Sequence, residues 1–165
     1  MINSKGQTLI ELIIYISILS VVLLVVTMIL FNLVQTQNII ITTANANDTT
    51  RFVLHDITQN IDSGYMVTSP NPSNSESNTL TVQTDSTGNK ISFYTKNGVI
   101  YSQYNDNSPI QLSSSNIYIY SMVFYEESVS GTSPTVKIDL EETNTLSSGQ
   151  KITKTYETTA TQRRQ

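Results

Sequence analysis

The sequence contains no cysteine and no tryptophan among its 165 residues, and it has a single histidine, His55. Without cysteine, neither a disulfide framework nor a thiolate metal site can form. The formal net charge of -4 also excludes a broadly basic surface of the kind that binds nucleic acid. Any domain in this chain must therefore be stabilised without disulfide bonds.

Proline and glycine are missing from one long stretch, between Gly6 and Gly64. These two residue types are the least favourable ones in a helix interior, so the stretch is expected to form a continuous helix from about residue 8 to residue 62. Asp48 and Thr49 are weak helix formers, which leaves a break near residues 45–50 as the alternative.

Charge is missing from residues 12–34, which are almost entirely apolar. At about 1.5 Å per residue, a helix over this range is roughly 35 Å long and can cross a hydrocarbon core of about 30 Å. Lys5 and the initiator amine precede the segment, and the next basic residue is Arg51. The positive-inside rule predicts a single-pass protein of the cytoplasmic membrane with its C-terminal domain outside.

Two ordinary interpretations of this segment are open. A secretory signal would be cleaved after Ala44-x-Ala46, although its apolar part usually spans only about 7 to 15 residues. An uncleaved anchor would carry an external binding module. Neither interpretation explains Glu11, because a carboxylate at the centre of a bilayer costs about 2.5 to 3.5 kcal/mol and usually has a partner.

The residues around Glu11 resemble the N-terminal motif of type IV pilins and type II secretion pseudopilins. Lys5 and Gly6 are followed by QTLIE, residues 7–11. The resemblance implies cleavage by a prepilin peptidase between Gly6 and Gln7 and N-methylation of the new terminus at Gln7, where the family most often has phenylalanine. It further implies that Glu11 pairs with the N-terminal amine of a neighbouring subunit, which would give each buried charge a partner.

After the apolar segment, the helical pattern becomes amphipathic. Leu54, Ile57 and Ile61 have helical spacing and are expected to face a core. Ala46 and Thr50 are expected on a neighbouring face. Three polar residues are expected to face water: Arg51, Asp56 and Gln59.

The pattern changes to a period of two beyond a Pro- and Ser-rich segment. Strands are expected near residues 79–84, 91–95, 116–128, 135–142 and 151–162, with a hairpin turn at Asn97-Gly98. The segment 116–128 is apolar on both faces, as in a central strand covered on both sides. In 135–142 the expected inward residues are Val136, Ile138 and Leu140, and the outward ones are Lys137, Asp139 and Glu141.

These expectations combine into an α+β fold in which a long N-terminal transmembrane helix packs against one C-terminal antiparallel sheet of about five to seven strands. This is the architecture of type IV pilins. The expected divisions are a leader (1–6), a transmembrane and assembly half of the helix (7–34), an amphipathic half (35–63), a loop (64–78) and a sheet domain (79–165).

The order of segments over most of the chain is similar to that of J-type minor pseudopilins and W-type minor pilins. This resemblance implies a minor subunit that primes or caps filament assembly for adhesion, motility, secretion or DNA uptake, in a pilus or periplasmic filament. The implied partners are prepilin peptidase, other pilin subunits and an inner-membrane assembly platform. A major pilin and an anchored adhesion module are the alternatives.

No cofactor, metal or catalytic activity is expected. His55 and Asp56 are adjacent on a helix and so point to different faces. The oxygen-rich segments 85–89 and 104–108 lack the spacing of a calcium loop and are interpreted as turns. Arg163 and Arg164 form a small basic end, which is weak support for DNA binding.

Overall fold

The computed structural model describes residues 9–70, 76–114, 117–127, 133–146 and 149–163. The chain divides into two compact units, Met1–Ile40 and Ile41–Gln165. Gly6, Gln7 and Arg164 lie outside the described residues, and so does the leader segment 1–6. We call residues 9–40, the described part of the first unit, the stem segment.

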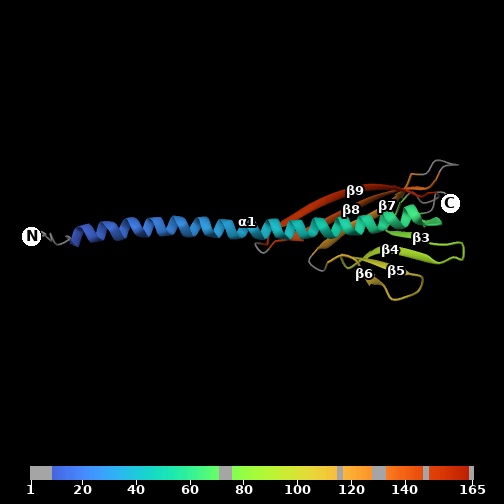
Figure 1. The fold of residues 1–165 in the computed structure, drawn as a ribbon, viewed down its shortest axis with the longest axis horizontal. Helices are drawn as coiled ribbons and strands as arrows, with labels where there is room; N and C mark the ends of the chain where they lie inside the picture. Colours follow the sequence, from blue (N-terminus) through green and yellow to red (C-terminus); the bar gives the residue numbers. More distant parts are fainter. Residues whose placement is uncertain (1–8, 71–75, 115–116, 128–132, 147–148, 164–165) are drawn as a thin grey trace, which may run out of the picture. The chain divides into compact units, whose positions relative to one another are not determined.

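The first element is helix α1, Leu9–Ser63, with 55 residues (Figure 1). It is helical through residues 45–50, so the predicted continuous helix is confirmed and the alternative break is not present. The absence of glycine and proline over this range explains why the backbone hydrogen bonds are uninterrupted.

The strands of the second unit form two antiparallel sheets in the described part of the chain. The first sheet has the order β1-β3-β4-β5-β6, and the second has the order β2-β7-β8-β9. The bounds are β1 Met66–Ser69, β2 Glu76–Ser77, β3 Thr79–Gln83, β4 Lys90–Lys96, β5 Val99–Tyr104, β6 Ile110–Gln111, β7 Tyr118–Glu126, β8 Thr135–Thr145 and β9 Lys151–Thr161.

Two predictions about this region are corrected. The single sheet of five to seven strands is replaced by two sheets, because β6 ends the pairing of the first sheet and β7 pairs with β2 and β8 instead. The expected loop over 64–78 contains β1 and β2, which pair with β3 and β7. Such strands of two to four residues depend on distant partners and carry no period of their own.

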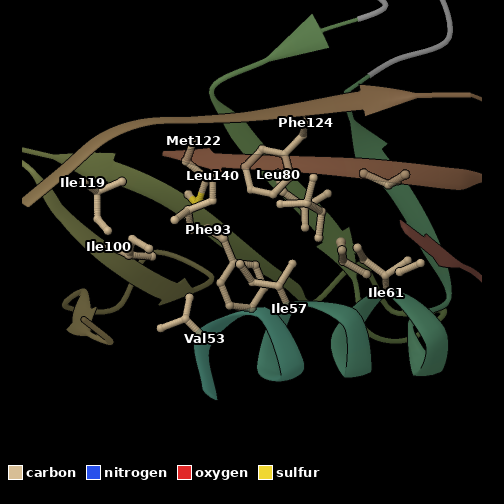
Figure 2. Packing of buried hydrophobic residues seen from close by; sticks show 14 of the residues in the cluster. Val53, Ile57, Ile61, Leu80, Phe93, Ile100, Ile119, Met122, Phe124 and Leu140 are labelled. Carbon is tan, nitrogen blue, oxygen red and sulfur yellow. The ribbon is translucent and has the colours of Figure 1, made fainter. Parts of the chain in front are cut away.

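The core of the second unit lies between helix α1 and the two sheets. The helix buries one stripe, consisting of Ala46, Thr50, Val53, Ile57 and Ile61. Figure 2 shows Val53, Ile57 and Ile61 pointing toward side chains of both sheets, among them Phe93 and Phe124. The stripe has the spacing of one helix face, which is why these residues are buried together.

The stripe differs in detail from the predicted one. Leu54 is only half-buried against the core, and Val53 takes the central position. Ala46 and Thr50 belong to the same stripe instead of a neighbouring face. Asp56 is half-buried, and its Oδ1 accepts a hydrogen bond of 3.3 Å from the side-chain Nδ2 of Asn60, one helical turn away. Arg51 and Gln59 are exposed, as predicted.

The hairpin prediction is confirmed at the turn between β4 and β5. Asn97 and Gly98 both have positive φ, 54° and 75°, as a two-residue hairpin turn requires. A Cβ atom on Gly98 would come within 2.4 Å of the Tyr118 ring. This position therefore needs glycine for its backbone conformation and also for space.

Strand β8 follows the predicted alternation, whereas β7 lacks the predicted cover on both faces. Val136, Ile138 and Leu140 are fully buried, and the residues between them are half-buried on the other face. In β7, Tyr118 and Tyr120 are 57% and 72% exposed, so the prediction of a strand covered on both faces is wrong. A tyrosine presents an apolar body and a polar tip, and its presence in the pattern made an exposed face look like a buried one.

Candidate functional site

The predicted site residue that the structure describes, Glu11, lies in the first turn of helix α1 and is exposed. An acidic side chain there is favoured by the positive end of the helix dipole. The other predicted site residues, Gly6 and Gln7, lie outside the described residues. Pairing of Glu11 with the amine of another subunit stays a prediction.

The stem segment that follows Glu11 exposes its apolar side chains. Every large apolar residue between Leu9 and Val34 is exposed in the chain taken alone. Helix α1 is long and apolar enough near its N-terminus to cross a membrane. A surface that is hydrophobic all round is stable only against lipid or other apolar helices.

Hydroxyl groups within the stem segment have partners on the helix itself. Ser17 donates a hydrogen bond of 2.8 Å to the carbonyl oxygen of Ile13, and Ser20 donates one of 2.7 Å to that of Ile16. Thr27 likewise donates to Leu23, at 2.8 Å. These polar groups can enter an apolar environment without losing a hydrogen bond.

Comparison with known proteins identifies the N-terminal region. Residues 1–27 match the family model described as the prokaryotic N-terminal methylation motif. No curated protein and no solved structure matches the chain.

The N-terminus of this protein is therefore type IV prepilin-like, and the motif supports processing by a prepilin peptidase. The long apolar helix together with the motif indicates a membrane-anchored protein. The layout of one long N-terminal apolar helix packed with an antiparallel sheet domain is that of a pilin-like α+β fold.

A second polar cluster was not found from the sequence. Glu142, on β8, is fully buried and accepts a hydrogen bond from the hydroxyl of Thr50 on helix α1. The Tyr156 hydroxyl, on β9, lies 3.1 Å from Glu142 Oε1 and 2.7 Å from Asn47 Oδ1. Lys154 Nζ donates a hydrogen bond of 2.8 Å to the same Asn47 oxygen. We call these five residues the Asn47 cluster.

Burial controls the chemistry of the tyrosine in this cluster. Burial of the hydroxyl, followed by the negative charge of Glu142, raises the pKa of Tyr156 to about 12. The hydroxyl therefore keeps its proton at any physiological pH and serves as a hydrogen-bond donor.

One sequence signal points to this cluster. Glu142 continues the buried alternation of Val136, Ile138 and Leu140 by one more step, so the period of two places an acid on the inward face. An inward acid is unusual enough to be searched for. Its partners on α1 and β9 are distant in sequence and give no comparable signal.

The oxygen-rich segment 85–89 forms a turn, as predicted. The Asp85 carboxylate accepts hydrogen bonds from the backbone and side chain of Thr87 and of Asn89, at 2.6 to 3.1 Å. The side-chain hydrogen bonds of Asn89 and then Thr87 lower the pKa of Asp85 to about 2. Within the described residues, no group of three or more metal-binding side chains is present.

Two further residues were considered from the sequence, His55 and Arg163. His55 is exposed on helix α1. Arg163 forms an ion pair of 3.0 Å with Asp62, and its backbone N–H donates to the Asp62 carbonyl at the end of the helix. Gln162 is buried and donates from Nε2 to the carbonyl oxygen of Gly64, at 2.8 Å. The described end of the chain therefore satisfies carbonyl groups at and just after the end of helix α1.

Proposed function

We propose that this protein is a minor subunit of a type IV filament, of the J-type pseudopilin or W-type minor pilin kind, which primes or caps filament assembly. The observation that carries the proposal is the methylation motif over residues 1–27, with Glu11 in the first turn of an exposed apolar helix. Its role is structural, and assembly occurs through packing of the stem segment against other pilin subunits.

Physical chemistry explains why Glu11 suits this role. Cleavage after Gly6 creates a new amine at Gln7, and a neighbouring subunit in the filament presents its own Glu11. A buried charge pair loses about 3 to 5 kcal/mol when one partner is removed. Pairing therefore favours subunits that dock in the correct register and disfavours those that do not.

The second unit offers a surface consistent with a specialised subunit. Tyr118 and Tyr120 lie two positions apart on β7, and both are exposed. Exposed tyrosines are frequent at recognition surfaces because they combine an apolar ring with a hydrogen-bonding hydroxyl. This exposure supports a tip position more than burial among identical major subunits.

The protein is expected to occupy two locations, one after the other. It first lies in the cytoplasmic membrane with its second unit outside, where the prepilin peptidase acts. The inner-membrane assembly platform then transfers it to a surface or periplasmic filament. Adhesion, motility, secretion and DNA uptake are the processes that such filaments serve.

Intact mass and N-terminal peptide analysis test the processing step. The protein produced with its cognate peptidase is expected to begin at Gln7, with or without a methyl group, and without the peptidase at Met1 or Ile2. Gly6→Val is expected to block cleavage. A start at Met1 or Ile2 under both conditions would instead establish an anchored binding module, and a start near Asn47 would establish a secretory signal.

Filament incorporation tests the assembly role. Glu11→Ala is expected to abolish incorporation and to leave membrane insertion intact, because only the pairing charge is lost. Leu12→Ala in the same helical turn is the matched control and is expected to retain incorporation. Normal incorporation of Glu11→Ala would refute the pairing. Quantification of the subunit in purified filaments separates a minor subunit from a major one.

A further inference from the structure

The Asn47 cluster brings an amine and a carboxamide into direct contact. Lys154 Nζ lies 2.8 Å from Asn47 Oδ1, although 107 positions separate the two residues in the chain. The Tyr156 hydroxyl lies 2.7 Å from the same oxygen, and Glu142 Oε1 lies 3.1 Å behind the hydroxyl. All of these residues belong to the second unit.

We propose that Lys154 and Asn47 form an intramolecular isopeptide bond, with Tyr156 as the catalytic hydrogen-bond donor and Glu142 as a positioning residue that also relays the proton. The bond would join helix α1 to strand β9. It requires no enzyme, cofactor or oxidant, and it is independent of the proposed function in filaments.

The reaction balances within the cluster. The neutral amine of Lys154 attacks Cγ of Asn47, and the negative charge that develops on Oδ1 is stabilised by the Tyr156 hydroxyl. Glu142 accepts the amine proton through that hydroxyl and returns a proton to Nδ2 of Asn47. The Cγ–Nδ2 bond then breaks, ammonia leaves, and an amide joins Nζ to Cγ without any change in oxidation state.

The environment of Glu142 supports the relay. Its side chain is 0% exposed, and within the described part of the chain no ion pair reaches it. It is held by hydrogen bonds from Thr50 and Asn144, and by its contact with Tyr156. The Tyr156 hydroxyl thus lies between the buried Glu142 carboxylate and the Asn47 oxygen that Lys154 contacts, which is the geometry that a proton relay requires.

The partner of Lys154 also distinguishes it from another lysine of the same sheet. Lys137 lies 3.1 Å from Asp139 and 3.6 Å from Glu157, so it is engaged in ion pairs. Lys154 contacts an amide, which is a group that an amine can attack with release of ammonia. The fold holds the two groups at contact distance, which replaces a bimolecular encounter with an intramolecular one.

A covalent link between these elements is also consistent with the composition of the chain. The protein contains no cysteine, so disulfides cannot join α1 to β9. An isopeptide bond closes a long loop and is stable in reducing and oxidising surroundings alike. It would reduce the conformational freedom of the unfolded chain in the manner of a disulfide.

Mass spectrometry of the full-length chain purified in detergent tests the bond. The denatured protein is expected to be lighter by about 17 Da than its sequence requires, the mass of one ammonia. Proteolysis is expected to give one fragment that contains both Asn47 and Lys154. This fragment is needed because cyclisation of Gln7 after cleavage also releases ammonia, but it leaves the two segments separate.

Variants assign the roles. Lys154→Arg keeps the charge and is expected to abolish the joined fragment, whereas Lys151→Arg, on the exposed face of the same strand, is expected to retain it. Tyr156→Phe is expected to stop the reaction, because it removes both the donor to Asn47 Oδ1 and the path of the proton to Glu142. Glu142→Gln is expected to stop it in a chain with unchanged circular dichroism, and Glu142→Asp is expected to restore part of it.

Two results would overturn the proposal. The first is a folded wild-type chain in which the Asn47 and Lys154 fragments separate with unmodified masses. The second is a joined fragment that forms equally well in Glu142→Gln and Tyr156→Phe, because the bond would then form without the chemistry assigned to these residues.

Discussion

Residues 9–40 and residues 41–63 belong to the same helix, but they use their side chains in different ways. The stem segment exposes its large apolar residues from Leu9 to Val34. The later residues bury one stripe against two sheets, and they supply Thr50 and Asn47 to a polar cluster. The large apolar residues from Leu9 to Val34 are therefore left uncovered by the chain itself, whereas the later part of the helix has one stripe that the chain covers.

This difference separates two kinds of stability. Burial within the chain contributes to folding, at about 25 cal/mol per Å² of apolar surface. Apolar surface that stays exposed in the single chain contributes only when lipid or another helix covers it. Mutations in the stem segment that have an effect should thus act on insertion or assembly, and mutations of the buried stripe in residues 41–63 should alter folding.

The largest expected contrast compares two isoleucines of helix α1. Ile57 is 0% exposed and Ile18 is 57% exposed. Ile57→Ala is expected to lower the free energy of unfolding by about 2 to 5 kcal/mol because it leaves a cavity in the core. Ile18→Ala is expected to leave it unchanged. Urea unfolding in detergent, followed by tyrosine fluorescence, measures both, and equal losses would contradict the comparison.

A second contrast compares two threonines. Thr50 donates its hydroxyl to the buried Glu142, whereas Thr27 donates to a carbonyl of its own helix. Thr50→Val is expected to cost about 1 to 3 kcal/mol of unfolding free energy, since a buried acceptor loses a donor. Thr27→Val is expected to have no effect on unfolding. A neutral Thr50→Val would mean that Glu142 does not depend on this hydroxyl.

Acid sensitivity gives a third test, confined to the second unit. The pKa of Asp85 lies at about 2, below its ordinary value of 3.8, so its carboxylate stabilises the folded state above about pH 4. This contribution should be lost as the pH falls from 3.8 toward 2. Asp85→Asn is expected to be less stable than the wild type at neutral pH, and the difference is expected to disappear as the pH falls below about 2. A difference that did not change with pH would contradict the assignment.

The smallest expected effect concerns the end of helix α1. The Arg163 side chain is largely exposed in its ion pair with Asp62. Arg163→Ala is expected to cost about 0 to 1 kcal/mol of unfolding free energy. High salt is expected to lower the unfolding free energy of the wild type but not that of the variant, because salt screens the ion pair. A larger loss, independent of salt, would show that the side chain contributes through packing and not through charge.

The helix and most strands could be predicted from the sequence because their signals are local. The absence of glycine and proline up to Gly64 defines α1, the period of two defines β8, and Asn97-Gly98 defines a hairpin. Glu11 was recognised as unusual by its place in an apolar segment. In each case the physical cause lies within a few neighbouring residues.

The remaining features depend on contacts between distant residues. The division into two sheets is determined by which strands pair with β7, and the strand sequences alone do not specify this choice. The Asn47 cluster joins α1, β8 and β9 across about a hundred residues, so its members have no common local pattern. By composition alone, Tyr118 and Tyr120 fit a buried strand as well as an exposed one. Only the fold shows that they are exposed.

The proposed bond between Asn47 and Lys154 would determine how mechanical tension passes through the second unit. A pull on the stem segment enters this unit at Ile41 and reaches Asn47 six residues later. If tension passes from there to β9, the residues between Asn47 and Lys154 carry little of it. Most of the hydrophobic core belongs to those residues and would be shielded from the load.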